Sequence, residues 1–331
     1  MDHPHQRRRA ARGHDLRAVH PRPQAGRDRA RPQGARRHRR PRPRDVQAIR
    51  RRRPRGVGCC CLARSAPTQT FTGVDSSGIG ALSVFRTPVI ITSPHNETLK
   101  QVRKLAAKRE RARAGAFVAE GEDLLEAADA AGWEPRARLC VAGSGLPGTE
   151  VEAELLHAVS QLGSGTRTLA IYDQRYAPAA TDGLTVHLHG VHDPGNVGTV
   201  LRAAHAFGAA AVSLGPGTAD PYGPKAVRAS MGAVFATPLV RAHGGVGDLP
   251  GATVALVARA GTALPRLGAQ LADGPVTLLV GAERDGLPDD VVAACDHVAH
   301  IPIEGESLNA AMAAGVALYE LRRIHMVTSD E

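Results

Sequence analysis

Short apolar segments alternate with helix-period segments throughout the chain after Gly183, and this alternation constrains the fold more than any other feature. Five of the apolar segments are expected to form strands, at residues 184–189, 210–214, 253–258, 276–280 and 298–303. Helical periodicity covers residues 197–207 and 308–324. The pattern predicts an α/β domain over residues 183–331, with a mostly parallel sheet covered on both faces. Ligands of such sheets bind at the carboxyl ends of the strands.

Residues 89–175 predict a second, smaller α/β unit, which a polar linker around Pro178 joins to the first. It opens with a short β-type run and a polar turn, followed by one long helix-period segment with a dense positive face. Four basic side chains of this segment are candidates for binding nucleic-acid phosphates: Lys104, Lys108, Arg109 and Arg111. A charged helix face is as often only solvated, so both interpretations stay open. A strand over residues 117–119 and a helix over residues 124–131 are expected next.

The formal net charge of +10 comes from the N-terminal part of the chain. The first 64 residues hold 21 arginines and 4 aspartates, whereas the remainder holds 21 basic and 28 acidic residues. Any nucleic-acid affinity of the folded part must therefore come from a local basic patch. Residues 1–88 lack apolar periodicity, so we expect them to be disordered. An RNA-binding arm, an unselected extension and a coding sequence assigned from too far upstream all fit this composition.

The cysteines and the lengths of the apolar runs indicate the cellular compartment in which the protein is expected. Three of the five cysteines are adjacent, at residues 59–61, and none of the five has metal-ligand spacing. No apolar run reaches the roughly 18 residues of a membrane span, and the arginine-rich start has no signal-peptide core. We therefore expect a soluble protein of the reducing cytoplasm, without a bound metal and without a membrane partner.

The first segment of chemical interest is GVHDPGNVGTVLRAAHAFGA, residues 190–209, which follows a strand and opens a helix. Asn196 is suited to capping this helix, and Gly208 is suited to ending it. Arg202 stands out, because helical side chains lean toward the helix N-terminus and its long arm can return toward Asn196 and the strand ends. By itself the segment is a strand-turn-helix joint with a surface arginine.

Two further segments carry polar residues beside glycine-bounded turns. In VTLLVGAERDGLP, residues 276–288, an apolar strand runs into a turn that holds Glu283, and Gly281 permits a ligand to approach the backbone closely. In residues 298–320, Ser307 is suited to capping a helix whose first turn holds Asn309. The apolar stripe of this helix is expected to be core or interface and consists of Leu308, Ala311, Met312, Gly315, Val316 and Tyr319.

Together, the three segments resemble the three motifs of the SpoU (TrmH-like) branch of the SPOUT methyltransferases. The resemblance lies in Asn196 with Arg202, in Gly281-Ala-Glu283 with Gly286-Leu287, and in Ile301-Pro302 with Ser307-Leu308-Asn309. Residues 225–233, which include Arg228, look like the segment that these enzymes carry between the first two motifs. The stretches TSPHN and FVAEG make residues 89–172 similar to an L30e-like substrate-recognition domain. Between Pro302 and Ser307 the chain is slightly shorter than many relatives, so we expect a tight cofactor loop.

The resemblance implies a deep trefoil knot, whose loops hold S-adenosylmethionine mostly through the backbone. The backbone groups expected to bind this cofactor belong to Gly281, Ile301, Ser307 and Leu308. It also implies methyl transfer to a ribose 2′-hydroxyl of RNA, and a homodimer whose active site lies at the interface between the copies. Ribosomal RNA is favoured over transfer RNA, because the L30e-like unit resembles a domain used on ribosomal RNA.

The family assigns activation of the hydroxyl to the arginine that matches Arg202. A guanidinium with a pKa above about 12 is a poor base, so we expect Arg202 to position the hydroxyl and the adjacent phosphate. Four other residues are expected to orient this arginine and complete the site: Asn196, Glu283, Ser307 and Asn309. Arg228 is expected to bind RNA together with the basic helix.

Three other functions compete with methyl transfer. A catalytically silent RNA-binding protein of the same fold is disfavoured by the complete set of Asn196, Arg202 and Asn309. A Rossmann oxidoreductase requires a GxGxxG fingerprint, which DPGNVG lacks. A structural RNA-binding protein of the ribosome accounts for the basic helix but leaves the three motifs unexplained.

Overall fold

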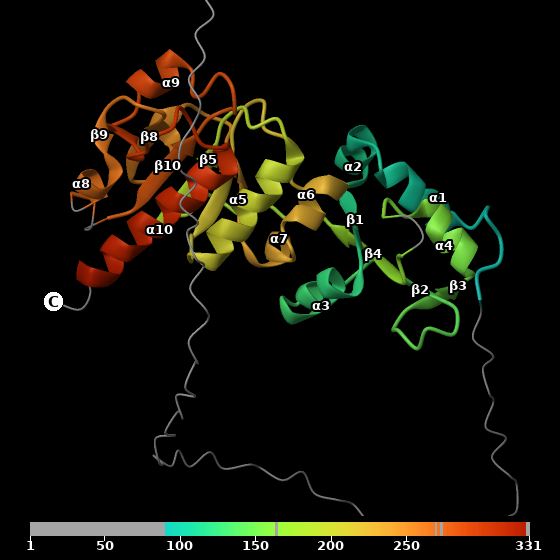
Figure 1. Ribbon diagram of the computed structural model, residues 1–331. Coiled ribbons are helices and arrows are strands. Elements are labelled where there is room, and N and C mark those ends of the chain that lie inside the picture. The colour runs from blue at the N-terminus through green and yellow to red at the C-terminus, as the bar shows by residue number, and fades with distance from the viewer. Residues whose placement is uncertain (1–89, 163–164, 269, 272–273, 329–331) are drawn as a thin grey trace, which may run out of the picture. The chain divides into compact units, whose positions relative to one another are not determined.

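The computed structural model describes residues 90–162, 165–268, 270–271 and 274–328, and these belong to one compact unit. Two sheets organise it (Figure 1). We call residues 90–175 the N-terminal lobe and residues 183–328 the C-terminal lobe. The disorder predicted for residues 1–88 lies outside the described residues.

The N-terminal lobe is built on a mixed sheet in the order β1-β4-β2-β3, in which β3 pairs parallel to β2 and the other pairs are antiparallel. Its elements are α1 (Glu97–Leu105), α2 (Lys108–Ala114), β1 (Ala116–Glu120), α3 (Glu122–Ala130), β2 (Ala137–Val141), β3 (Thr149–Val151), α4 (Ala153–Val159) and β4 (Thr168–Asp173). The prediction of one long basic helix is wrong, because the backbone becomes extended at Ala107 and separates α1 from α2. The strand and the helix predicted after it are confirmed as β1 and α3.

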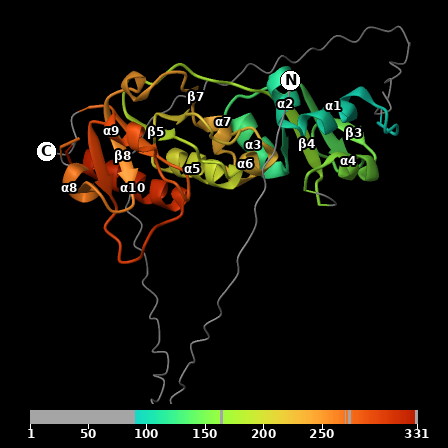
Figure 2. The same cartoon turned by 90° about the horizontal axis from the view of Figure 1, so that it is seen from above.

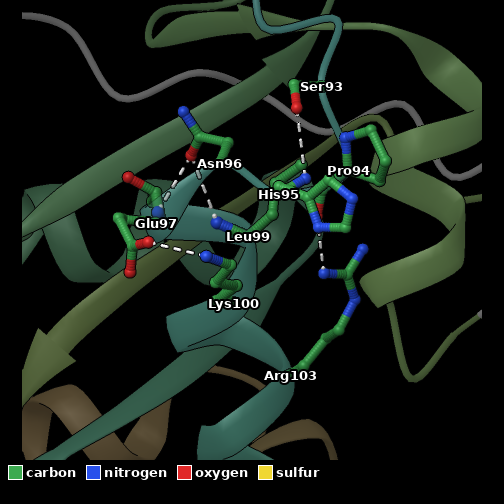
Figure 3. A network of polar contacts seen from close by, with 9 residues as sticks. Ser93, Pro94, His95, Asn96, Glu97, Leu99, Lys100 and Arg103 are labelled. Atoms are coloured by element: carbon green, nitrogen blue, oxygen red, sulfur yellow. Dashed lines mark hydrogen bonds and ion pairs between the residues drawn. The ribbon is translucent and has the colours of Figure 1, made fainter.

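The polar turn before α1 fixes the start of that helix (Figure 3). The Asn96 side chain accepts hydrogen bonds from the backbone N–H groups of Thr98 and Leu99, at 2.9 and 3.4 Å. Arg103 reaches back from the last turn and donates to the carbonyl of Pro94 at 2.9 Å. The TSPHN stretch is thus the N-terminal cap of α1, and Arg103 in the last turn of the same helix also holds it in place.

The C-terminal lobe contains a parallel sheet in the order β7-β6-β5-β10-β8-β11-β9, which confirms the predicted parallel architecture. Its elements are β5 (Leu184–Leu188), α5 (Pro194–Ala206), β6 (Ala211–Leu214), α6 (Pro224–Ala229), α7 (Ala233–Ala236), β7 (Leu239–Arg241), the 3₁₀-helix η1 (Val246–Asp248), β8 (Ala252–Val257), β9 (Thr262–Ala263), α8 (Leu264–Gly268), β10 (Val276–Val280), α9 (Asp289–Ala293), β11 (His297–His300) and α10 (Ala310–Thr328). Every residue of the central strands β5 and β10 is buried.

The helices α5 and α10 lie side by side (Figures 1 and 2). Gly315 of α10 faces Ala203 of α5, and a Cβ placed on Gly315 would lie 3.9 Å from the Ala203 Cβ. Further along, the rings of Phe207 and Tyr319 meet at 6.0 Å between centroids. The two helices thus pack closely where small residues face each other.

The predicted caps of both helices need correction. α5 begins at Pro194, and its cap is Asp193, which accepts from the Gly195 N–H at 2.9 Å. Asn196 lies inside the first turn, because proline is already suited to the first helical position. Asn309 rather than Ser307 caps α10, since its Oδ1 accepts from the backbone N–H groups of the second and third helical residues, at 3.0 and 3.2 Å.

The apolar stripe predicted for the last helix divides between two faces of α10. Ala311 is buried, as are further apolar residues of the helix that pack on the sheet. Met312, Val316 and Tyr319 are instead 59%, 41% and 56% exposed. We call these three residues the outer strip of α10.

Aromatic side chains join the two lobes. Phe117, Trp133 and Tyr172 of the N-terminal lobe pack against Tyr222 and Phe235 of the C-terminal lobe. The Trp133 indole N–H donates to the Phe235 carbonyl at 2.9 Å, within the buried core. Within the described residues, no helix is long and apolar enough to cross a membrane.

Candidate active site

A cleft of about 470 Å³ opens where β8, β10 and β11 end. Two loops form its walls, residues 281–287 after β10 and residues 301–308 after β11, and Ala310 and Ala313 of α10 close one side. A cleft at the carboxyl ends of parallel strands is where the sequence analysis expects a ligand. Its volume lies within the range of small-molecule and cofactor sites.

The first loop folds tightly on itself. Ala282 and Gly286 exchange two backbone hydrogen bonds, at 3.0 and 3.1 Å, and Gly286 adopts a positive φ of 67°. A Cβ on Gly281 would lie 2.2 Å from the Gly286 carbonyl carbon, so only glycine fits there. The close approach predicted at Gly281 is thus made by the chain itself.

A chain of side-chain hydrogen bonds connects the three sequence motifs beside the cleft. Asn196 donates through Nδ2 to Glu283 Oε1 at 2.5 Å. Asn309 donates through Nδ2 to Asn196 Oδ1 at 3.2 Å. Three residues that lie far apart in the sequence therefore meet at one point.

Because Asn309 caps α10, it fixes which group donates and which accepts in each of these hydrogen bonds. The Asn309 oxygen must accept from backbone N–H groups, so its amide nitrogen is left to donate to the Asn196 oxygen. The Asn196 nitrogen can then face only an acceptor, and the Glu283 carboxylate supplies it. The start of α10 consequently holds the carboxylate of Glu283 in place.

Arg202 does not take part in this series of side-chain hydrogen bonds. It is exposed on α5, and no hydrogen bond or ion pair links it to Asn196, Glu283 or Asn309 within the described residues. Six helical residues correspond to a rotation of roughly 240°, so Arg202 and Asn196 occupy different faces of α5. The predicted return of Arg202 toward Asn196 is therefore not made within this copy of the chain.

The remaining predicted cofactor residues lie at the cleft. Ile301, Ser307 and Leu308 line it together with Gly281. Ser307 is exposed in the loop before α10 and is separate from the chain of amides. The structure thus brings the four predicted cofactor residues to one cavity, while it divides the five predicted catalytic residues among three places.

The predicted RNA-binding residues differ in exposure. Lys104, Lys108, Arg109 and Arg228 are exposed. Arg111 is buried, and its guanidinium pairs with Asp220 at 2.8 Å and donates to two backbone carbonyls at the end of α1. The prediction that Arg111 faces RNA phosphate is wrong, because its hydrogen-bonding groups are already used within the protein.

Sequence reasoning missed an ion pair at the start of α5. Lys225 contacts the carboxylate of Asp193 at 2.6 Å, and this contact, followed by the Gly195 N–H, holds the pKa of Asp193 below its usual value. Both partners are partly exposed, so the pair contributes little stability by itself. The adjacent acid and proline at 193 and 194 are the local signal that identifies the cap.

Comparison with family models gives two matches along the chain. Residues 183–319 match the SpoU rRNA Methylase family, and residues 96–175 match the MRM3-like substrate binding domain. The first match contains the cleft and the amide chain, and the second contains the basic residues of α1 and α2.

Whole-chain relatives agree with these matches. The chain is 32% identical over 250 residues to the 23S rRNA (guanosine(2553)-2′-O)-methyltransferase RlmP of Bacillus subtilis, covering 70% of this chain and 98% of the relative. An AdoMet-bound rRNA methyltransferase from Sinorhizobium meliloti superimposes with a TM-score of 0.63 at 31% identity, over 71% of this chain and 97% of the other. The SpoU methyltransferase AviRb of Streptomyces viridochromogenes, in complex with AdoMet, gives a TM-score of 0.60 at 27% identity, with 70% and 98% covered.

The chain belongs to the SpoU rRNA methylase family. It is a methyltransferase, and its methyl donor is S-adenosylmethionine.

The cleft fits this cofactor. Leu256, Val280 and Val298 give it apolar surface for an adenine ring. The acidic side chains of Glu283 and Asp285 on the first loop complement the positive charges of a sulfonium and an α-ammonium group. We infer the fit from this combination of apolar and acidic lining.

Proposed function

We propose that the protein transfers a methyl group from S-adenosylmethionine to a ribose 2′-hydroxyl of ribosomal RNA. The observation that carries the proposal is the hydrogen-bonded chain of Glu283, Asn196 and Asn309 beside the cofactor cleft. The names of two relatives support the substrate class, since they describe 2′-O-methylation of a guanosine and of a uridine in 23S rRNA. The two relatives act on different bases, so the feature that their substrates share is the ribose.

The cofactor supplies an electrophilic methyl group when bound. The protein's own task is to hold the ribose hydroxyl in line with that group, and such alignment can contribute up to about 7 to 11 kcal/mol. Glu283 and Asn196 offer a carboxylate and an amide that orient a hydroxyl or a guanidinium at the rim of the cleft. Asn309 prevents the Asn196 amide from rotating.

Arg202 serves this site from the boundary between two copies of the chain. Arg202 is exposed on α5, and this helix packs against α10, whose outer strip leaves three large apolar side chains in solvent. Exposed apolar clusters of this kind mark interaction surfaces. A homodimer that covers the outer strip places Arg202 at the interface, where its guanidinium can grip a ribose hydroxyl and the adjacent phosphate of RNA. The trefoil knot remains a prediction of the family resemblance.

The N-terminal lobe recognises the RNA. Its exposed basic residues Lys104, Lys108 and Arg109, together with Arg228 of the C-terminal lobe, supply phosphate contacts. The unpaired thiols of Cys140 and Cys295 suit a reducing cytoplasm, which is the compartment we infer.

The test is methyl transfer by the purified protein to ribosomal RNA from cells that lack the gene. Labelled S-adenosylmethionine reports transfer, and sequencing after alkaline fragmentation locates 2′-O-methyl groups. We expect a single new 2′-O-methyl nucleotide in ribosomal RNA. Methylation of a base, or transfer to transfer RNA alone, would contradict the proposal.

A further inference from the structure

A second cavity, of about 380 Å³, opens beside the segment that leads into α5. Both lobes line it: α2 contributes Lys108 and Arg111, and the C-terminal lobe contributes the segment around His192, residues 217–223 and the start of α6. We call this cavity the basic groove. It is open to solvent, which suits a ligand that continues beyond it.

The acidic groups of the basic groove are already neutralised. The buried pair of Arg111 and Asp220 forms part of the wall, and Asp220 also accepts the Tyr222 N–H at 3.0 Å. The neighbouring Asp193 is held by Lys225 and by the start of α5. The cation Lys108 and the imidazole of His192 are therefore the groups that can offer hydrogen-bond donors to an anion.

The basic groove adjoins the active site along one short segment. His192 lies four residues before Asn196, and four residues span at most about 14 Å. In the same segment, a Cβ placed on Gly190 would lie 3.8 Å from the Ala282 Cβ at the cleft. A strand that presents a ribose to Asn196 and Glu283 can therefore continue into the groove with its neighbouring nucleotide.

We propose that the basic groove binds a phosphodiester of the RNA strand next to the methylated ribose, with Lys108 and His192 as its contacts. This inference rests on the proposed function, and it adds the path of the strand between the lobes. The contacts come from two lobes, which the Arg111–Asp220 ion pair joins at the wall of the groove. A phosphate contact at this place fixes which nucleotide of the strand reaches the cleft.

The test pairs protein variants with RNA that has lost one charge. Substrates carry a neutral methylphosphonate at single positions around the target, and their affinities are measured for the full-length protein and for Lys108→Ala and His192→Ala. With the parent protein, one substitution next to the target should weaken binding about tenfold, as expected for a charged hydrogen bond. With either variant, that same substitution should weaken binding less than it does with the parent, because one of the two contacts is already gone.

Arg266→Ala is the matched control for Lys108→Ala, since it removes one exposed positive charge from α8, which contributes no residue to the groove. It should keep the full methylphosphonate effect. If the variant and the methylphosphonate reduce RNA affinity by independent factors, the two factors multiply at every position. In that case the groove does not bind the phosphate, and the inference is wrong. A parent protein that methylates no RNA contradicts the proposed function instead, so the two failures are distinguishable. Unchanged S-adenosylmethionine affinity confirms that each variant is folded.

Discussion

Asn309 performs two tasks with one amide, and two substitutions separate them. Its oxygen caps α10 and its nitrogen holds the Asn196 oxygen at 3.2 Å. Asn309→Ala removes both contacts. Asn309→Asp keeps an oxygen for the cap but replaces the donor by a second acceptor, which repels the Asn196 oxygen.

The structure sets the size of each effect. Loss of the cap in Asn309→Ala should lower the free energy of unfolding by about 1 kcal/mol, which lowers Tm by roughly 2 to 4 °C in a unit of this size. Asn309→Asp should change stability by less than about 0.5 kcal/mol, since a carboxylate is favourable at a helix N-terminus. In the aspartate variant the Asn196 amide must turn its nitrogen toward residue 309 and its oxygen toward Glu283. The Glu283–Asn196 contact is then lost.

We expect both variants to lose methyl transfer by about 100-fold, because a displacement on the order of 1 Å at the reacting groups is sufficient for that loss. Urea unfolding measures stability, and single-turnover transfer to the cognate RNA measures activity. Cofactor affinity, measured by calorimetry, is the control and should stay near the parental value. Parental turnover in Asn309→Asp would refute the role of the amide chain, and equal stability losses in both variants would refute the separation of cap from chain.

Four further outcomes are expected. Arg202→Ala should lower single-turnover methyl transfer about 100-fold or more with little change in S-adenosylmethionine affinity, because the contact is made mainly in the transition state. Gly281→Ala should abolish cofactor binding in calorimetry, since its Cβ would lie 2.2 Å from the Gly286 carbonyl carbon. Met312→Glu should yield monomers in sedimentation, because it charges the outer strip of α10. Burial lowers the pKa of His187 from 6.5 to about 4, so the unfolded chain takes up a proton in that window and the folded chain does not. The free energy of unfolding should therefore fall as pH drops from 6.5 to 4, with His187 contributing on the order of 3 kcal/mol, and the fall should be smaller by about that amount in His187→Gln.

The sequence predicts the sheet well where strands are long and buried on both faces. The segments that become β5 and β10 are nearly continuous apolar runs, which is the pattern of central parallel strands. The edge strands β7 and β9 have only three and two residues, too few to show a period. The sequence does not reveal the division between α1 and α2, because Ala106 and Ala107 favour a helix locally.

The motif residues were found through their family resemblance, and their meeting could not be derived locally. The Asn196–Glu283 bond joins positions 87 residues apart, and the Asn309–Asn196 bond joins positions 113 residues apart. Local pattern indicates a cap, a turn or a strand, but it contains no information on which turns meet. The caps are misplaced for a different reason. At each helix start, several residues satisfy the same local rule for an N-terminal cap.

Arg111 shows how a distant partner changes the role of a basic side chain. Locally it is indistinguishable from Arg109, yet its guanidinium pairs with Asp220, a residue 109 positions further along the chain. A buried arginine that pairs with a buried acid no longer contributes charge to the surface, so it adds nothing to RNA attraction. It fixes α2 to the segment before α6, and Lys108 lies one helical turn away on the same face of α2. The arginine lost from the predicted RNA contacts thus fixes the position of the lysine that we propose as a phosphate contact.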